Sequence, residues 1–204
     1  PWRTPVLPRH GPAVAAHLRA HSGPHSGAAI SAVPSSSHLE ISPLLFRTLV
    51  LERLRLPIPL MEATCEGCGS ALDSHGRHRA ACGRSGRLKT RAMPLEKSMA
   101  RVCREAGATV RYNQLLRDMN VAVSAADERR IEVLAQDLPC FAGMQLAIDV
   151  TLRSSLTVSG TARARADRED AAVLTDAPLE KETHYAELVQ SRCCQLVVVA
   201  IDTG

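Results

Sequence analysis

The order of the apolar segments in the second half of the chain constrains its fold most strongly. Between residues 93 and 204, the patterns typical of helices and strands follow the order helix, strand, strand, strand, helix, strand. Helices are predicted to begin at Pro94 and Pro178, because proline suits the first helical turn. The strands are predicted in ATVRYNQLL, RRIEVLAQDL, QLAIDVTLR and CCQLVVVAI. This order indicates an α/β domain with a single mixed central sheet.

The chain before this domain changes character at about residue 43. Residues 1–42 are rich in Pro, Ser, Gly, Ala and His with little periodicity, which predicts an irregular, flexible segment. Residues 43–60 predict an amphipathic helix with a core role, and docking on a protein partner is the alternative. Because the chain begins with Pro1, we expect it to be a piece of a longer protein. The apolar positions of the helix are Phe46, Leu49, Val50 and Leu54.

A cysteine-rich stretch, CEGCGSALDSHGRHRAAC, lies within residues 61–92. Its spacing, C-x2-C-x9-H-x3-C, is typical of a closed tetrahedral zinc site of the structural kind. His75 competes for the nitrogen position, and His78 is favoured because it lies one helical turn before the last cysteine. A glycine-rich loop with coincidental cysteines is the alternative. The predicted zinc ligands are Cys65, Cys68, His78 and Cys82.

Basic residues surround and follow this stretch. Residues 76–104 contain nine Lys/Arg and one acid, whereas residues 105–204 contain ten Lys/Arg and fifteen acids. A basic loop held in a fixed shape by zinc suits phosphate contacts, so nucleic-acid binding is predicted there. A solvated basic loop is the alternative. The predicted DNA-binding residues are Arg77, Arg79, Arg84, Arg87, Lys89 and Arg91.

Two overall features limit the environment of the chain. Its seven cysteines are an odd number and no secretory segment is present, so we expect free thiols in a reducing compartment. No run of about eighteen apolar residues occurs, so no membrane span is predicted.

Two carboxylates in the predicted strands are candidates for a second metal site. Asp149 sits among apolar residues, where an unpaired charge is costly, and Glu132 lies in the preceding strand. Acids on neighbouring strands can share Mg2+, which prefers oxygen ligands and can activate water against a phosphodiester. Lys181 is the candidate for orienting that water or stabilising the developing charge. In the alternative, Asp149 caps the end of a strand and Glu132 faces solvent.

Several stretches between residues 46 and 204 share the pattern of a known family. They are FRTLVLERLRLPIPL, CEGCGSALDSHGRHRAAC, LEKSMARVCREAG, RRIEVLAQDLP, QLAIDVTL, KETHYAEL and QLVVVAIDTG. Together they resemble the C-terminal segment of the polyprotein of site-specific non-LTR retrotransposons. The resemblance implies a zinc knuckle followed, over residues 93–204, by a restriction-endonuclease-like αβββαβ core of the PD-(D/E)xK superfamily. It also implies a Mg2+-dependent nuclease that nicks target DNA, works in the nucleus, and has element RNA and an upstream reverse-transcriptase domain as partners.

The resemblance assigns roles to individual residues. Glu132 and Asp149 match the two metal-binding acids, and Lys181 with Tyr185 matches the lysine and tyrosine of a K-x3-Y helix. Glu96, in the first helix, matches an auxiliary acid.

The chain also departs from the family pattern. Ile131 and Glu132 replace proline and aspartate, and Thr151 replaces the lysine of D-x-K. Glutamate is one methylene longer than aspartate, so the metal geometry is expected to differ, and copies of such elements are often decayed. Two further hypotheses therefore stay open, namely a non-catalytic nucleic-acid-binding module and a zinc-stabilised protein-interaction domain.

Overall fold

The structure, a computed structural model, describes residues 11–23, 26–37, 40–59, 63–141, 143–191 and 194–203. The chain divides into two compact units. Residues 93–204, predicted to be one domain, are therefore shared between them, because the segment after the third strand belongs to unit 1. Unit 1 comprises Pro1–Leu88, Ser154–Val173 and Asp202–Gly204, and unit 2 comprises Lys89–Arg153 and Leu174–Ile201.

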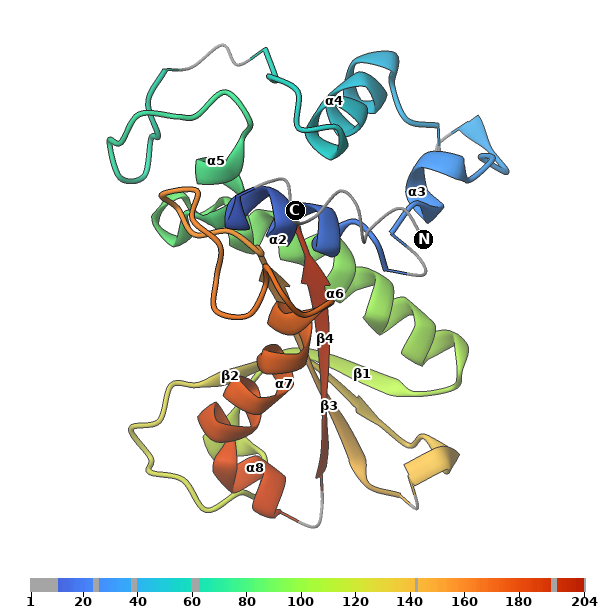
Figure 1. The fold of residues 1–204 in the computed structure, drawn as a ribbon. Helices are drawn as coiled ribbons and strands as arrows, with labels where there is room; N and C mark the ends of the chain where they lie inside the picture. The colour runs from blue at the N-terminus through green and yellow to red at the C-terminus, as the bar shows by residue number, and fades with distance from the viewer. Residues whose placement is uncertain are drawn as a thin grey trace. The chain divides into compact units, whose positions relative to one another are not determined.

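Unit 2 is built on a four-stranded sheet with the order β1-β2-β3-β4. The first three strands form an antiparallel meander, and β4 runs in the same direction as β3 beside it, so the sheet is mixed, as predicted (Figure 1). The strands are β1 (Thr109–Leu115), β2 (Arg130–Gln136), β3 (Gln145–Arg153) and β4 (Cys194–Asp202).

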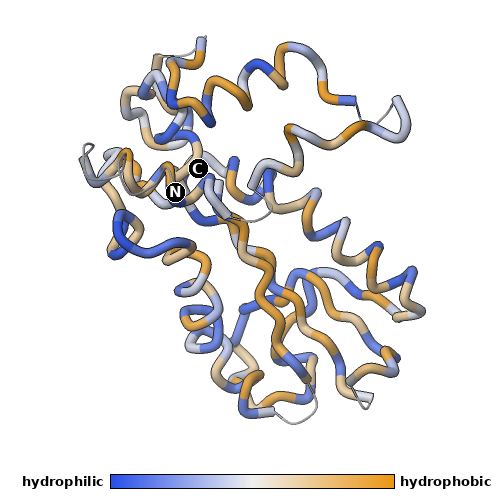
Figure 2. The backbone as a smooth tube through the Cα atoms, turned by 45° about the vertical axis from the view of Figure 1, so that its right-hand side comes forward, coloured by the Kyte–Doolittle hydropathy of each residue, from blue (hydrophilic) through white to orange (hydrophobic). Residues whose placement is uncertain are grey.

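Helices cover both faces of this sheet. On one face, Ala100 and Cys103 of α6 (Arg87–Glu105) belong to a buried cluster with Val133 and Ile148. On the other face, a cluster contains Tyr185 and Leu188 of the α8 region together with Leu134 and Ala147. Because both faces are covered, β2 and β3 are apolar along most of their length (Figure 2). The helices of the second face are α7 (Ala172–His184) and α8 (Ala186–Gln190).

Both predicted helix starts at proline are wrong. Helix α6 begins at Arg87, and α7 begins at Ala172, so Pro94 and Pro178 lie inside them. Proline costs a backbone hydrogen bond within a helix, but packing compensates for this loss. Ala92 and Ala177, in the turns that precede or contain the prolines, are both buried. Tertiary contacts thus extend both helices beyond the local signal.

The first part of unit 1 is more helical than predicted. Residues 1–42 contain α2 (Pro12–Ala20) and α3 (Ala28–Ser31), so the expectation of an irregular segment is wrong for these stretches. The alanines and the proline at the first turn of α2 favour a helix. Residues 1–10, 24–25 and 38–39 lie outside the described part of the chain.

The predicted helix is present as α4 (Pro43–Arg53), and Ser42 caps it by accepting a hydrogen bond from the Leu45 amide. Its predicted core role is wrong for this chain, because none of its residues is buried. Leu44 and Leu45 are 71% and 52% exposed. The apolar residues of α4 are spread around the helix rather than gathered on one face, so no single face can bury them together.

The expectations of no membrane span and of free thiols both concern the environment of the chain. Within the described residues, no helix is both long and apolar enough to cross a membrane. Free thiols are present, as expected, at Cys65, Cys68, Cys82, Cys103 and Cys140, and Cys193 lies outside the described residues.

The packing of α8 predicts the effect of two neighbouring substitutions. Leu188 is fully buried between α8 and the sheet, whereas the adjacent Val189 is 48% exposed. Leu188→Ala should therefore lower the free energy of unfolding by about 2–5 kcal/mol, through lost burial and the cavity left behind. Val189→Ala should change it by less than about 0.5 kcal/mol. Urea unfolding followed by circular dichroism measures both, and equal effects would contradict the packing described for α8.

Candidate functional site

A fully buried carboxylate lies at the centre of unit 2. Asp149 has no exposed surface, although its neighbours Ile148 and Val150 are apolar core residues. Two groups contact its Oδ2 atom. The Lys181 Nζ donates a hydrogen bond at 2.7 Å, and the Tyr185 hydroxyl lies at 3.1 Å. A buried charge needs partners of this kind, so Asp149 is a paired interior group rather than the cap of a strand end.

Glu132 lies across the sheet from Asp149. The β2–β3 register pairs Val133 with Ile148, and one residue further along it sets Glu132 opposite Asp149 on the same face of the sheet. The Glu132 Oε2 and the Asp149 Oδ1 are both buried without a hydrogen-bond partner. Burial, together with the nearby charge of Asp149, raises the pKa of Glu132 to about 7. Apart from the contact between the two carboxyl groups themselves, no described protein group satisfies these oxygens.

The break between α7 and α8 positions the two partners of Asp149. Lys181 and Tyr185 are four residues apart, so they project from one side of the helical segment. Tyr185 begins α8 with non-helical dihedral angles, and its ring is buried against the sheet. Its hydroxyl also lies 2.9 Å from the Arg130 carbonyl oxygen, which ties the segment to β2. Burial raises the pKa of Tyr185, so the phenol stays protonated as a donor.

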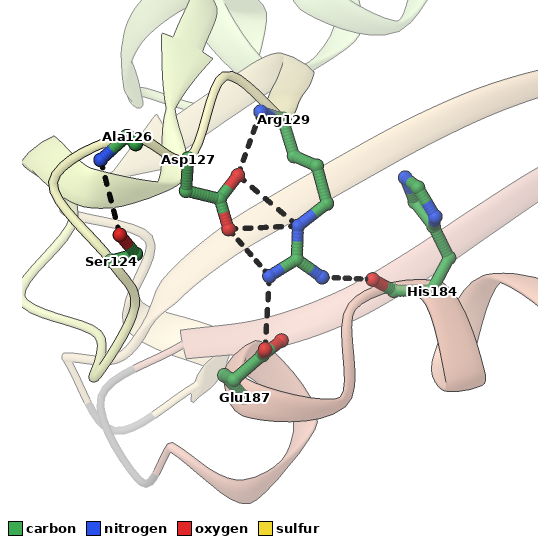
Figure 3. Close-up of polar contacts among 6 residues, drawn as sticks. All are labelled: Ser124, Ala126, Asp127, Arg129, His184 and Glu187. Carbon is green, nitrogen blue, oxygen red and sulfur yellow. Dashed lines mark hydrogen bonds and ion pairs between the residues drawn. The ribbon is translucent and has the colours of Figure 1, made fainter.

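A second set of contacts, centred on Arg129, braces the same region (Figure 3). Its guanidinium pairs with Asp127 at 2.6 Å and with Glu187 at 2.9 Å, and it donates to the His184 carbonyl oxygen. The start of β2 is thereby joined to the α7–α8 break, which carries Tyr185. No sequence motif singles out Arg129. The only local signal was a basic residue two positions after an acid, which is common on protein surfaces.

Glu96 has a weaker connection to this site. It lies on α6, whose residues Leu95 and Met99 pack against the opposite cluster of the sheet. Burial raises the pKa of Glu96, and the charge of Asp149 adds to the effect. Glu96 is therefore connected to Asp149 through electrostatics, and the auxiliary role of Glu96 stays a prediction.

Unit 1 brings the predicted zinc ligands together. One ligand atom from each of the four residues lies within 4.8 Å of the others. The buried Sγ atoms of Cys65 and Cys82 are 3.9 Å apart. In a tetrahedral zinc site with Zn–S bonds of about 2.3 Å, two thiolate sulfurs are about 3.8 Å apart. The Cys68 Sγ lies 3.1 Å from the His78 Nε2. This cluster of Cys65, Cys68, His78 and Cys82 could bind zinc.

Local backbone geometry explains how the cluster forms. Gly69 has φ +71°, a conformation that L side chains rarely adopt. A Cβ atom on Gly67 would lie 2.4 Å from the backbone of Arg84 and Ser85, so the segment after the cluster passes too close for a side chain. The Asp73 carboxylate accepts a hydrogen bond of 2.7 Å from the His78 amide at the start of α5 (Arg77–Ala81). These contacts orient the ligands from both sides.

The alternative nitrogen ligand is outside the cluster. The His75 Nδ1 lies 3.2 Å from the Ser74 hydroxyl, and the structure brings His78 to the three sulfurs instead. Hydrogen bonds from Ser70 lower the pKa of the Cys68 thiol to about 6, which favours the thiolate that zinc needs.

The predicted DNA-binding cations differ in exposure. Arg84, Lys89 and Arg91 are exposed, whereas Arg77 and Arg79 are half-buried. The Arg87 guanidinium forms an exposed ion pair of 3.2 Å with Glu66. Their role in DNA binding stays a prediction.

No protein-family model matches the chain, and no curated protein matches it in sequence.

The two histidines provide a test of the zinc cluster. Because only His78 joins the three sulfurs, His78→Ala should remove one zinc ion per chain, whereas His75→Ala should retain it. Elemental analysis of the purified full chain measures the loss. Equal zinc contents in the two variants would contradict the ligand set.

The raised pKa of Glu132 predicts a pH-dependent stability. In the folded chain the carboxyl keeps its proton up to a pKa of about 7, against an ordinary value of 4.5. The folded state thus binds more protons in that window, so Glu132 lowers stability as pH rises through it. At pH 8 in EDTA, Glu132→Gln should be more stable than the unchanged chain by about 1–3 kcal/mol.

The same comparison near pH 4 should show almost no difference, because the carboxyl is then protonated in both states. Glu128→Gln, at an exposed position, is the control. Urea unfolding at both pH values provides the measurement, and a pH-independent gain for Glu132→Gln would refute the argument.

Proposed function

We propose that this protein is a Mg2+-dependent DNA endonuclease, derived from the C-terminal segment of a site-specific non-LTR retrotransposon polyprotein. Unit 2 is the nuclease, with a restriction-endonuclease-like core, and the Cys3His cluster is a structural zinc knuckle. The αβββαβ order of α6, the strands and α7 agrees with this assignment.

One observation carries the proposal. Glu132 and Asp149 lie opposite each other on adjacent strands, each with a buried carboxylate oxygen that no described group outside the pair satisfies. A satisfied structural ion pair would leave no such oxygens, because buried polar groups in folded proteins are almost always bonded. A divalent cation with hard oxygen ligands would satisfy both.

The proposed chemistry divides between the ion and the chain. Bound Mg2+ would polarise the phosphodiester and lower the pKa of its water. Tyr185 holds the Asp149 carboxylate in place. The Lys181 ammonium has further N–H donors besides the one on Asp149, and it would orient water or stabilise charge on the phosphate. The lysine on a separate helix thus takes the role left vacant by Thr151.

The partners follow from the same proposal. The exposed cations would contact DNA phosphates: Arg84 directly after the zinc knuckle, which would hold that loop in shape, and Lys89 and Arg91 on α6 rather than on the predicted loop. Element RNA, an upstream reverse-transcriptase domain and action in the nucleus belong to the proposal through the family resemblance.

A second function is favoured by one specific observation. Lys181 already neutralises Asp149 at 2.7 Å, and the longer Glu132 stands where the family has aspartate. A chain that kept this pairing as a scaffold would bind nucleic acid without cutting it.

A nicking assay separates the two functions. The purified full chain should nick supercoiled plasmid in Mg2+ and not in EDTA. Asp149→Ala should abolish nicking, and Lys181→Met should slow it by about 100-fold, as expected for the loss of one group that stabilises developing charge. Asp118→Asn, at an exposed position, should nick normally.

Equal nicking by the Asp149 variant and the unchanged chain would indicate a contaminating nuclease and reject the site. Salt-sensitive DNA binding with no cleavage in Mg2+ would favour the scaffold function instead.

A further inference from the structure

Two helices of unit 1 bring a second set of metal-ligating side chains together. His17 lies in α2, His21 caps the end of that helix, and Glu52 lies in α4. One ligand atom from each lies within 4.8 Å of the others. The two histidines are four residues apart, so they project from the same side of α2. Their rings meet edge to face, with centroids 4.4 Å apart.

The buried histidine has an unsatisfied nitrogen. His17 is only 5% exposed, and its Nε2 has no hydrogen-bond partner. The neighbouring His21 Nε2 lies 3.5 Å from the Glu52 Oε1, which is longer than a good hydrogen bond. An imidazole nitrogen that is buried without a partner loses its hydrogen bonds to water and gains none in the protein, which costs free energy. A bound metal ion would compensate for that loss.

The surrounding contacts already hold the helices in position. Arg53 of α4 donates hydrogen bonds to the Ser26 and His21 carbonyl oxygens, at 2.7 and 3.1 Å. These bonds fix the end of α2 beside α4. The guanidinium of Arg55 also acts on His17 electrostatically and opposes a cation there, while the Glu52 carboxylate favours one.

Apolar packing alone gives α4 little support. None of its residues is buried, and the buried apolar residues of α2 are the small Ala15 and Ala16. A metal ion that joins two such helices would supply folding energy that the missing core does not.

We propose that His17, His21 and Glu52 form a second metal site, selective for zinc-class divalent ions, that links α2 to α4. Two imidazoles and a carboxylate form a three-ligand zinc set, which leaves a fourth position for water or an exchangeable anion. The site differs from the Cys3His cluster in chemistry, because it contains no thiolate, and it does not depend on the proposed nuclease.

Cobalt substitution distinguishes the two sites in the full chain. Only the Cys3His cluster can give a thiolate-to-cobalt charge-transfer band. With Glu132→Gln, which removes one acid of the carboxylate pair proposed to bind Mg2+, the chain should bind two ions, one with this band and one without it, for both cobalt and zinc. His17→Ala and Glu52→Gln should each bind one ion fewer and keep the charge-transfer band. His184→Ala, an exposed histidine of unit 2, should bind both ions.

The unchanged chain provides a test that needs no variant. Its α2 and α4 amides should exchange more slowly with zinc than after chelation. Saturation at a single ion, with the full thiolate band, would overturn the proposal. Retention of both ions by folded Glu52→Gln and His17→Ala would also overturn it.

Discussion

The buried charge of Asp149 is the constraint on which the arrangement of unit 2 depends. A carboxylate with no exposed surface, inside an apolar strand, is tolerated only with close partners. Those partners, Lys181 and Tyr185, come from the segment around the α7–α8 break. The segment must therefore lie on that face of the sheet and break at Tyr185. Removing Lys181 would leave an uncompensated charge in the core, which costs more than the lost contact itself.

The contacts of Arg129 show how this arrangement is kept in register. Arg129 joins the start of β2 to the α7–α8 break through Asp127, Glu187 and a backbone carbonyl (Figure 3). The strand that carries Glu132 and the helix that carries Lys181 are thus held to each other by contacts that do not involve Glu132 or Asp149. Such support is what a site that must bind an ion in a defined geometry requires.

The two units are stabilised by different means. Unit 2 has large side chains on both faces of its sheet, such as Ile148 and Leu188. Among the described residues of unit 1, the buried apolar side chains are mostly alanine and cysteine, and Leu156 is the largest of them. Small cores of this kind usually need additional links. The Cys3His cluster and the proposed His17–His21–Glu52 site would both supply them, in a part of the chain that buries little apolar surface.

The sequence by itself determined the strands, the mixed sheet and the three cysteines of the Cys3His cluster. Alternation and apolar runs depend only on neighbouring residues, and ligand spacing within eighteen residues is almost local. Only the tertiary structure decided where the helices begin, that α4 stays exposed, that His78 rather than His75 joins the sulfurs, and that Arg129 braces the site. It also set Glu132 opposite Asp149 and brought two histidines of α2 to a glutamate of α4. These outcomes depend on packing and charge pairing between residues far apart in sequence, and no local pattern records such contacts.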